Sequence, residues 1–229
     1  MSNLSGLYAK GISKAFGARQ VLDDLSLDCP AGTITGIVGR NGSGKSTLLR
    51  GLTGQLALDR GEVLLNGRRL PSEPAWRRAR RAMAWTFQDV SAPIGMRVNE
   101  MVALARGANT TAPRDGLSEA LAAFEHQRWS ELSFGQRKLA AFAAASARAP
   151  KVLLLDEPIA GLSGGYADLV AASLEALKQT GCAIFLIEHD RSFLERHAEH
   201  VAVLNQGRII FAGAPQSAFG SEAVLEALA

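Results

Sequence analysis

The segment 39–46, GRNGSGKS, fits the pattern G-x-x-x-x-G-K-[ST] of a phosphate-binding loop. Each fixed position has a physical role. The glycines let the backbone turn its N–H groups toward phosphate oxygens, the ammonium of Lys45 reaches the β and γ phosphates, and the hydroxyl of Ser46 can ligate Mg²⁺. An apolar run at 34–38 precedes the loop and helix-forming residues 47–50 follow it. This order predicts a strand, a loop and a helix whose N-terminus faces an anion, rather than an ordinary glycine-rich turn.

Composition limits the classes of protein to which the chain can belong. Its 229 residues are 47% hydrophobic and 21% charged, which is typical of one globular domain, or of one domain with an inserted subdomain. The net charge of +3 is too small to indicate nucleic acid binding. The only two cysteines, Cys29 and Cys182, form neither a metal-type pair nor a disulfide framework. We therefore expect both to be small core residues and the chain to reside in a reducing cytosol.

The chain carries no recognisable membrane segment. Its first residues lack the basic and apolar regions of a signal peptide, and no run reaches about 18 apolar residues. We therefore expect that any role at a membrane depends on a separate chain.

The hydrophobic pattern predicts an α/β fold. Continuous apolar runs at 152–155 and 183–187 are typical of strands buried on both faces of a parallel sheet. The other predicted strands lie at 7–12, 21–29, 63–65, 82–87 and, as a terminal hairpin, 201–211. The predicted helices lie at 98–105, 117–125, 134–148 and 167–178. The segment 89–129, with a polar break at 107–113, is interpreted as a helical subdomain inserted into a single domain made of 1–88 and 130–229, whose early strands form an antiparallel edge.

Polar residues follow three of the apolar strands. Asp156 and Glu157 end one, His189 follows another, and Gln88 follows a third. Since ligands bind at the carboxyl ends of strands in open α/β sheets, we expect these side chains near the phosphate loop. Asp156 suits Mg²⁺, Glu157 suits activation of water, and Gln88 can ligate the metal or hold the water. The alternatives, a solvated turn for the acidic pair and a structural hydrogen bond for His189, are less favoured in this context.

A second helix N-terminus suited to an anion follows Leu132. Ser133 is predicted to cap the alanine-rich helix that begins there, leaving N–H groups for phosphate. The sequence alone does not bring the two helix ends together.

The ordered set of motifs resembles the ATP-binding-cassette (ABC) ATPases. The resemblance extends from about residue 7 to 219. Its positions are 39–46 for the Walker A loop, Gln88 for the Q-loop glutamine, 132–136 (LSFGQ) for the signature LSGGQ, 152–157 for Walker B with the catalytic glutamate, His189 for the switch histidine, and Phe16 for the aromatic residue that stacks on adenine.

The resemblance implies a P-loop core with an antiparallel β subdomain, and a head-to-tail dimer around two ATP molecules, in which each signature helix contacts the neighbour's nucleotide. It also implies a second cassette, which is either identical or different. The segment 89–129 would dock on membrane-spanning permease subunits. The chain would then be a peripheral protein at the cytoplasmic face of the cell membrane. The implied contacts are ATP with Phe16, Gly39, Arg40, Asn41, Gly42, Ser43, Gly44, Lys45, Ser46, Thr47, Ser133, Gly135 and Gln136; Mg²⁺ with Ser46, Gln88 and Asp156; and catalysis by Glu157, His189 and Gln88.

Two residues depart from the family pattern. Phe134 stands where the signature has glycine, and a backbone amide can still bind phosphate there if the residue is helical. Ser163 stands where the family has aspartate. Any coupling across the dimer that relies on that carboxylate would be weakened, and the change is compatible with a second, different cassette.

The segments 186–190 (LIEHD) and 133–138 (SFGQRK) are similar to cassettes of branched-chain amino-acid or urea importers. The alternatives left open are an exporter cassette, a soluble cassette such as one in iron–sulfur assembly, and a regulator that mainly binds nucleotide. The arginine cluster at 77–81 is interpreted as a solvated helix face.

Overall fold

The phosphate loop follows a strand near the middle of a six-stranded sheet. The computed structural model describes residues 5–88, 95–107, 116–163 and 165–229. The strand order is β10-β9-β3-β8-β7-β6, in which only β10 is antiparallel to its neighbour. The bounds are β3 Ile34–Val38, β6 Met83–Thr86, β7 Val152–Asp156, β8 Ala183–Ile187, β9 His200–Asn205 and β10 Arg208–Gly213. The predicted parallel sheet is confirmed, because β8 pairs in parallel with both β3 and β7, and all three strands are buried along their whole length.

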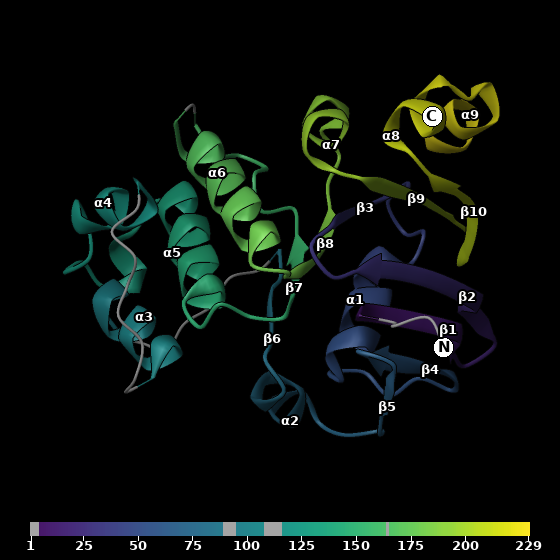
Figure 1. The fold of residues 1–229 in the computed structure, drawn as a ribbon, viewed down its shortest axis with the longest axis horizontal. Helices are drawn as coiled ribbons and strands as arrows, with labels where there is room; N and C mark the ends of the chain where they lie inside the picture. Colours follow the sequence, from purple (N-terminus) through teal and green to yellow (C-terminus); the bar gives the residue numbers. More distant parts are fainter. Residues whose placement is uncertain (1–4, 89–94, 108–115, 164) are drawn as a thin grey trace.

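A separate antiparallel sheet has the order β2-β1-β4-β5 and lies on one side of the molecule (Figure 1). Its strands are β1 Gly6–Phe16, β2 Arg19–Pro30, β4 Arg60–Leu65 and β5 Arg68–Leu70. Asn66 and Gly67 form a tight turn between β4 and β5, with φ of 50° and 73°, the left-handed values that a two-residue hairpin turn requires. The predicted antiparallel edge is thus confirmed.

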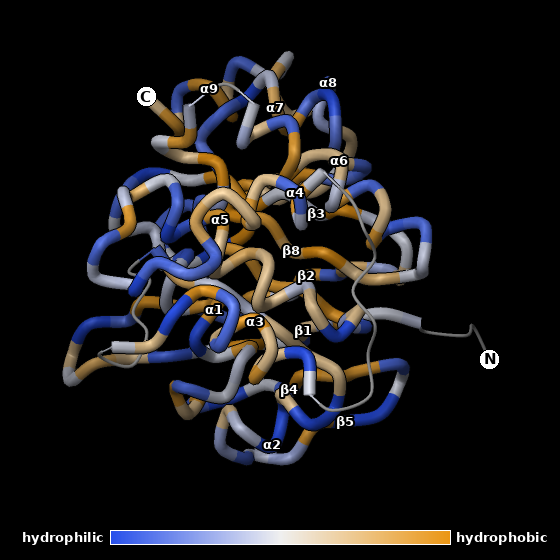
Figure 2. The backbone as a smooth tube through the Cα atoms, turned by 90° about the vertical axis from the view of Figure 1, so that its left-hand side faces the viewer, coloured by the Kyte–Doolittle hydropathy of each residue, from blue (hydrophilic) through white to orange (hydrophobic). Residues whose placement is uncertain are grey.

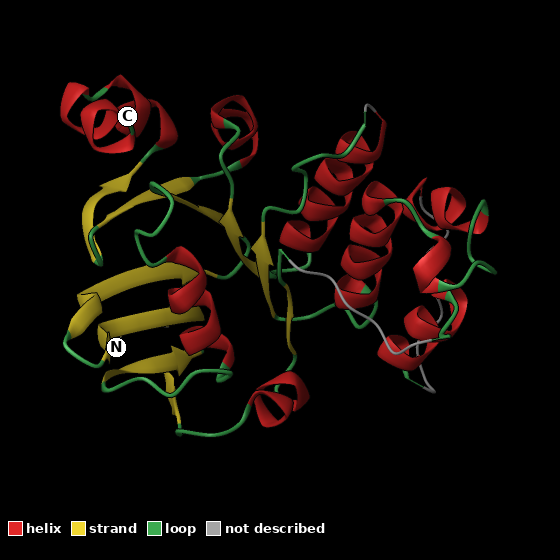
Figure 3. Cartoon of the chain, turned by 180° about the vertical axis from the view of Figure 1, so that it is seen from behind, coloured by secondary structure: helices red, strands yellow, loops and turns green. Residues whose placement is uncertain are grey.

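Two hydrophobic cores cover the two faces of the parallel sheet. On one face, Leu48, Leu49 and Leu52 of α1 pack with residues of β1 and β2, so α1 lies between the two sheets. On the other face, α5, α6, α7 and α8 contribute the buried side chains. Figure 2 shows the hydrophobic strands β3 and β8 in the interior, and Figure 3 shows α1 against the antiparallel sheet, with α5 and α6 on the far side of the parallel sheet. The helices are α1 Lys45–Thr53, α2 Ala75–Arg80, α3 Val98–Arg106, α4 Gly116–Ala122, α5 Phe134–Ser146, α6 Gly165–Gln179, α7 Arg191–His197, α8 Pro215–Gly220 and α9 Glu222–Leu228, with a 3-10 turn at Trp129–Glu131.

The helices α3 and α4 both contact α5, at the end of the molecule opposite the antiparallel sheet (Figure 1). They confirm the helices predicted at 98–105 and 117–125. Most of the polar break predicted at 107–113 lies outside the described residues. Within the described part of the chain, no helix has the length and apolar character needed to span a membrane.

Both cysteines are core residues, as predicted. Cys29 and Cys182 are buried and unpaired. Burial raises the pKa of each thiol to about 12. Neither thiol therefore ionises near neutral pH, which excludes them as nucleophiles.

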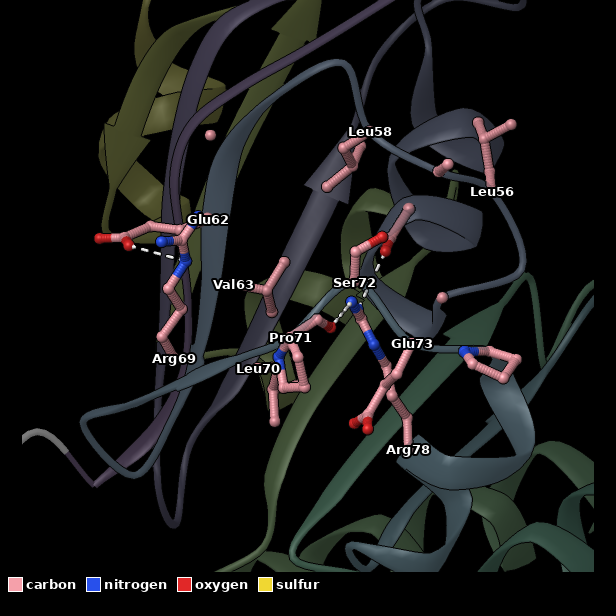
Figure 4. Close-up of a pocket in the computed structure, with 15 residues that line it drawn as sticks. Leu56, Leu58, Glu62, Val63, Arg69, Leu70, Pro71, Ser72, Glu73 and Arg78 are labelled. Atoms are coloured by element: carbon pink, nitrogen blue, oxygen red, sulfur yellow. Dashed lines mark hydrogen bonds and ion pairs between the residues drawn. The ribbon is translucent and has the colours of Figure 1, made fainter.

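The interpretation of the arginine cluster as a solvated face is wrong for one member. Arg77, Arg80 and Arg81 are exposed, but the side chain of Arg78 is only 5% exposed. Its guanidinium donates to the carbonyl oxygens of Gly51 (3.1 Å) and Leu52 (2.6 Å) near the C-terminus of α1. Figure 4 shows this side chain crossing from α2 toward α1 at the wall of a cavity of about 530 Å³. Arg78 therefore caps α1, the helix that begins at the phosphate loop.

Replacing Arg78 by methionine should lower the free energy of unfolding by about 1–3 kcal/mol, because two buried carbonyl groups lose their donor. Arg80→Met is the matched control, since Arg80 lies on the same helix but is exposed; its effect should stay within about 0.5 kcal/mol. Urea denaturation of the nucleotide-free chain measures both. Equal stability of the two variants would contradict the capping role.

Candidate nucleotide-binding and hydrolysis site

A cavity of about 470 Å³ lies over the N-terminus of α1, at the edge where β7 ends. Most of the residues predicted for phosphate, metal and catalysis meet there. Its lining consists of Arg19, Val21, Asn41, Gly42, Gly44, Lys45, Ser46, Thr47, Gln88, Asp156 and Glu157. Residues separated by more than a hundred positions in the sequence are thus brought into one pocket.

The phosphate loop leaves the N-terminus of α1 open to an anion. The N-cap residue Gly44 has φ of 113°, no side chain caps the helix, and its first turn holds no acidic residue. A Cβ added to Gly39 would collide with the carbonyl oxygen of Leu204, so the loop packs closely on β9. The buried hydroxyl of Ser43 has no hydrogen-bond partner among the described residues. Uncapped N–H groups at a helix start bind phosphate well.

Lys45 folds back over the loop. Its ammonium donates to the carbonyl oxygens of Gly39 (2.6 Å) and Arg40 (3.1 Å), and the residue is only 8% exposed. Burial lowers the pKa of Lys45, while the charges of Glu157 and Asp156 oppose that shift. The ammonium is thus desolvated beside the cavity, and a phosphate oxygen would be a stronger acceptor than either neutral carbonyl.

Asp156 and Ser46 lie next to each other, as expected for a shared metal. The hydroxyl of Ser46 donates to Oδ2 of Asp156 at 3.3 Å. Burial raises the pKa of Asp156, and the nearby charge of Glu157 raises it further. A cation would relieve this cost, and hydroxyl, carboxylate and amide oxygens suit Mg²⁺. The described residues include no cluster of three or more His, Cys, Asp or Glu that could hold a metal. The hydroxyl of Ser46, the carboxylate of Asp156 and the amide oxygen of Gln88 are a donor set that fits Mg²⁺, an ion that proteins hold through one or two carboxylates together with substrate phosphates.

Glu157 lies between the two other polar residues predicted at strand ends. Its Oε1 is 3.0 Å from Nε2 of His189, and its Oε2 accepts from Nε2 of Gln88 at 3.3 Å. The strands explain this convergence, because β7 is paired with β6 and with β8 in parallel. Glu157 itself has φ of 51°, a left-handed conformation that is uncommon for a non-glycine residue. The expected grouping of Gln88, Asp156, Glu157 and His189 at one sheet edge is observed.

The signature segment 132–136 lies at the N-terminus of α5, apart from the phosphate loop at the N-terminus of α1. Ser133 is the N-cap, as predicted: its hydroxyl accepts from the N–H of Gln136 at 3.2 Å, and the Gln136 side chain accepts from the N–H of Ser133 at 2.9 Å. Phe134 is the first helical residue, which meets the condition for its amide to bind phosphate. Ser133, Gly135 and Gln136 do not line the 470 Å³ cavity. Their contact with nucleotide remains a prediction that requires a second subunit.

Phe16, predicted to stack on adenine, ends β1 and is 51% exposed. It does not line the 470 Å³ cavity, whereas Arg19 and Val21 of β2 do. Sequence reasoning missed these two residues. The turn at Gly17 was the available signal, because the hairpin it forms brings the start of β2 to the phosphate loop.

The match to known proteins extends over most of the chain. Residues 22–160 match the family described as ABC transporter. The "Hemin import ATP-binding protein HmuV" of Thermobifida fusca is 35% identical over 93% of this chain and 78% of its own length. The "Fe(3+) ions import ATP-binding protein FbpC" of Pseudomonas fluorescens is 34% identical over 93% of this chain, which spans 62% of that relative's length. Other relatives are named for sulfate/thiosulfate and cobalt import.

The fold matches solved structures of ATP-binding cassettes. A solved nucleotide-free ATP-binding cassette from an ABC transporter superposes with a TM-score of 0.83 at 27% identity, covering 96% of this chain and 97% of the other. The predicted P-loop cassette fold is therefore confirmed. From its motifs, its site and these matches, the chain belongs to the ABC transporter family and is one of that family's ATPase cassettes.

Proposed function

We propose that the chain is the ATP-hydrolysing subunit of an importer, and that it drives solute uptake through separate permease subunits. The observation that carries this proposal is the convergence of Lys45, Asp156, Glu157 and Gln88 on one cavity at the N-terminus of α1. The import names of the relatives support the direction of transport.

In the proposed binding step, the open N–H groups of the phosphate loop and α1 bind the phosphates. Lys45 exchanges its bonds to the Gly39 and Arg40 carbonyls for phosphate oxygens. Phe16 stacks on the adenine, and Ser46, Asp156 and Gln88 supply oxygens for Mg²⁺. A Mg²⁺ ion held by these residues would supply positive charge that offsets the charge of the phosphates.

In the proposed hydrolysis step, Glu157 accepts a proton from the attacking water. Its carboxylate is already held between Nε2 of His189 and Nε2 of Gln88, and these two side chains detect the γ-phosphate. A positioned general base of this kind contributes about 10²–10⁴-fold to a rate.

We further propose that two cassettes enclose the nucleotide, because the α5 N-terminus is a second phosphate site that lies outside the cavity of its own subunit. The helices within 89–129 form the subdomain that docks on the permease, at the cytoplasmic face of the membrane. The second cassette is the same chain or a different one, the latter favoured by Ser163, which is exposed and uncharged.

The solute is a separate part of the proposal. The segments 186–190 and 133–138 are similar to branched-chain amino-acid and urea cassettes, which favours a small organic solute. The relatives are named for iron, hemin, sulfate and cobalt, and these names do not support that class in particular.

Gentle purification of the tagged chain from native membranes tests the assembly. We expect membrane-spanning subunits in stoichiometric amounts, and loss of uptake of their solute when the chain is deleted. Recovery of a soluble iron–sulfur scaffold in place of a permease would refute the transport role, and solute efflux through the recovered complex would refute import.

A further inference from the structure

Lys138 is a buried charged residue that the proposed chemistry does not use. It lies on α5, five residues after the N-cap Ser133, and is only 5% exposed. Its ammonium donates to the carbonyl oxygens of Glu157 (2.6 Å) and Ala160 (2.7 Å), and it lies 5.0 Å from the centre of the Phe134 ring. Two short bonds and a ring contact define its position, so it is not a solvated lysine on an alanine-rich helix.

The turn that Lys138 holds is the one that carries the catalytic carboxylate. Glu157 occupies a left-handed conformation, which costs a non-glycine residue free energy unless its surroundings fix it. Its N–H donates to the carbonyl of Ile187 at 2.9 Å, and Lys138 holds its carbonyl. The direction of the Glu157 side chain depends on this backbone conformation. If the turn relaxed to ordinary φ values, the carboxylate would leave His189 and Gln88.

A second buried charged residue, Glu188, also binds this turn. The carboxylate of Glu188, which is 2% exposed, accepts from the N–H of Ile159 (3.0 Å) and from the N–H of His189 (3.2 Å). Burial lowers the pKa of Lys138, but the charges of Glu188, Glu157 and Asp156 favour its ammonium form. Lys138 therefore binds carbonyl oxygens of this turn, and Glu188 binds an N–H group of the same turn.

We propose that Lys138 is a positioning residue for hydrolysis: it fixes the backbone of Glu157 and connects α5 to the carboxylate that activates water. This inference rests on the proposed role of Glu157. In a two-cassette assembly, α5 would contact the neighbour's nucleotide, so Lys138 would connect one ATP site to the base of the other.

The test compares turnover in Lys138→Met and Lys138→Arg with the intact chain in its assembled complex. Methionine keeps the apolar stem but leaves both carbonyls without their donor, so kcat should fall at least about tenfold while the KM for ATP changes less than about threefold. Arginine can donate to both carbonyls, so it should restore most of kcat. Lys178→Met is the matched control, because Lys178 is a partly buried helical lysine paired with Glu175 and Glu199 away from the cavity.

Amide hydrogen exchange of the nucleotide-free chain provides a readout that does not need hydrolysis. Protection at 157–162 should decrease in Lys138→Met, recover in Lys138→Arg and stay unchanged in Lys178→Met. Unchanged protection or unchanged kcat in Lys138→Met would overturn the inference, and so would an equal loss of kcat in the Lys178 control. An intact complex that does not hydrolyse ATP would refute the proposed function instead, and the exchange data would still decide whether Lys138 holds the turn.

Discussion

Replacing Glu157 by glutamine should lower steady ATP hydrolysis by about 10²–10³-fold, with ATP affinity nearly unchanged. Glutamine has the size of glutamate, so it can keep a contact with Gln88 or His189, but it cannot accept a proton from water. The effect should appear in kcat. Because the nucleotide persists, the variant with Mg²⁺ and ATP should also form a dimer that sedimentation velocity detects.

The chain contains a close control for this change. Glu175 on α6 also pairs with a histidine, at 3.4 Å from Nδ1 of His197, but it lies outside the 470 Å³ cavity. Glu175→Gln therefore alters a similar carboxylate–histidine contact, together with the salt bridge to Lys178, and should leave turnover within about twofold. Wild-type turnover in Glu157→Gln would exclude Glu157 as the base. A strictly monomeric chain under these conditions, with the permease and second cassette supplied, would contradict the shared nucleotide site.

The grouping of Gln88, Asp156, Glu157 and His189 could be predicted from the sequence because it depends on a general property of parallel sheets. Asp156 and His189 each follow a continuous apolar run, and such runs indicate central strands whose carboxyl ends share one edge. The observed pairing of β7 with β8 confirms that step of the argument. The phosphate loop was equally readable, since its function depends on a local sequence of glycines and a lysine.

Lys138 and Arg78 could not be recognised in the same way. Each belongs to a segment whose local pattern suggests a solvated residue: an alanine-rich helix for Lys138 and an arginine cluster on a short helix for Arg78. Their partners are backbone carbonyls, and carbonyls carry no sequence signal. Their roles depend on the distance between separate elements, α5 to the end of β7 and α2 to the end of α1. Only the folded structure supplies that distance.

Replacing Lys45 by alanine should weaken ATP binding by about 10–150-fold, the equivalent of 1.5–3 kcal/mol for hydrogen bonds to charged groups. The ammonium of Lys45 donates to the neutral carbonyls of Gly39 and Arg40, and burial lowers its pKa. The gain from Lys45 is therefore largest when a phosphate is present. Isothermal titration with ATP and Mg²⁺ at low temperature measures the loss.

Lys151→Ala is the control for the removal of a positive charge. Lys151 is exposed and precedes β7, at the opposite end of that strand from Asp156, so its loss should leave affinity unchanged. Thermal unfolding gives an independent check, because a ligand that binds only the folded chain stabilises it by RT ln(1 + [L]/Kd). ATP should raise the Tm of the intact chain and of Lys151→Ala, but barely that of Lys45→Ala. If all three Tm values rise equally, Lys45 does not bind the phosphates.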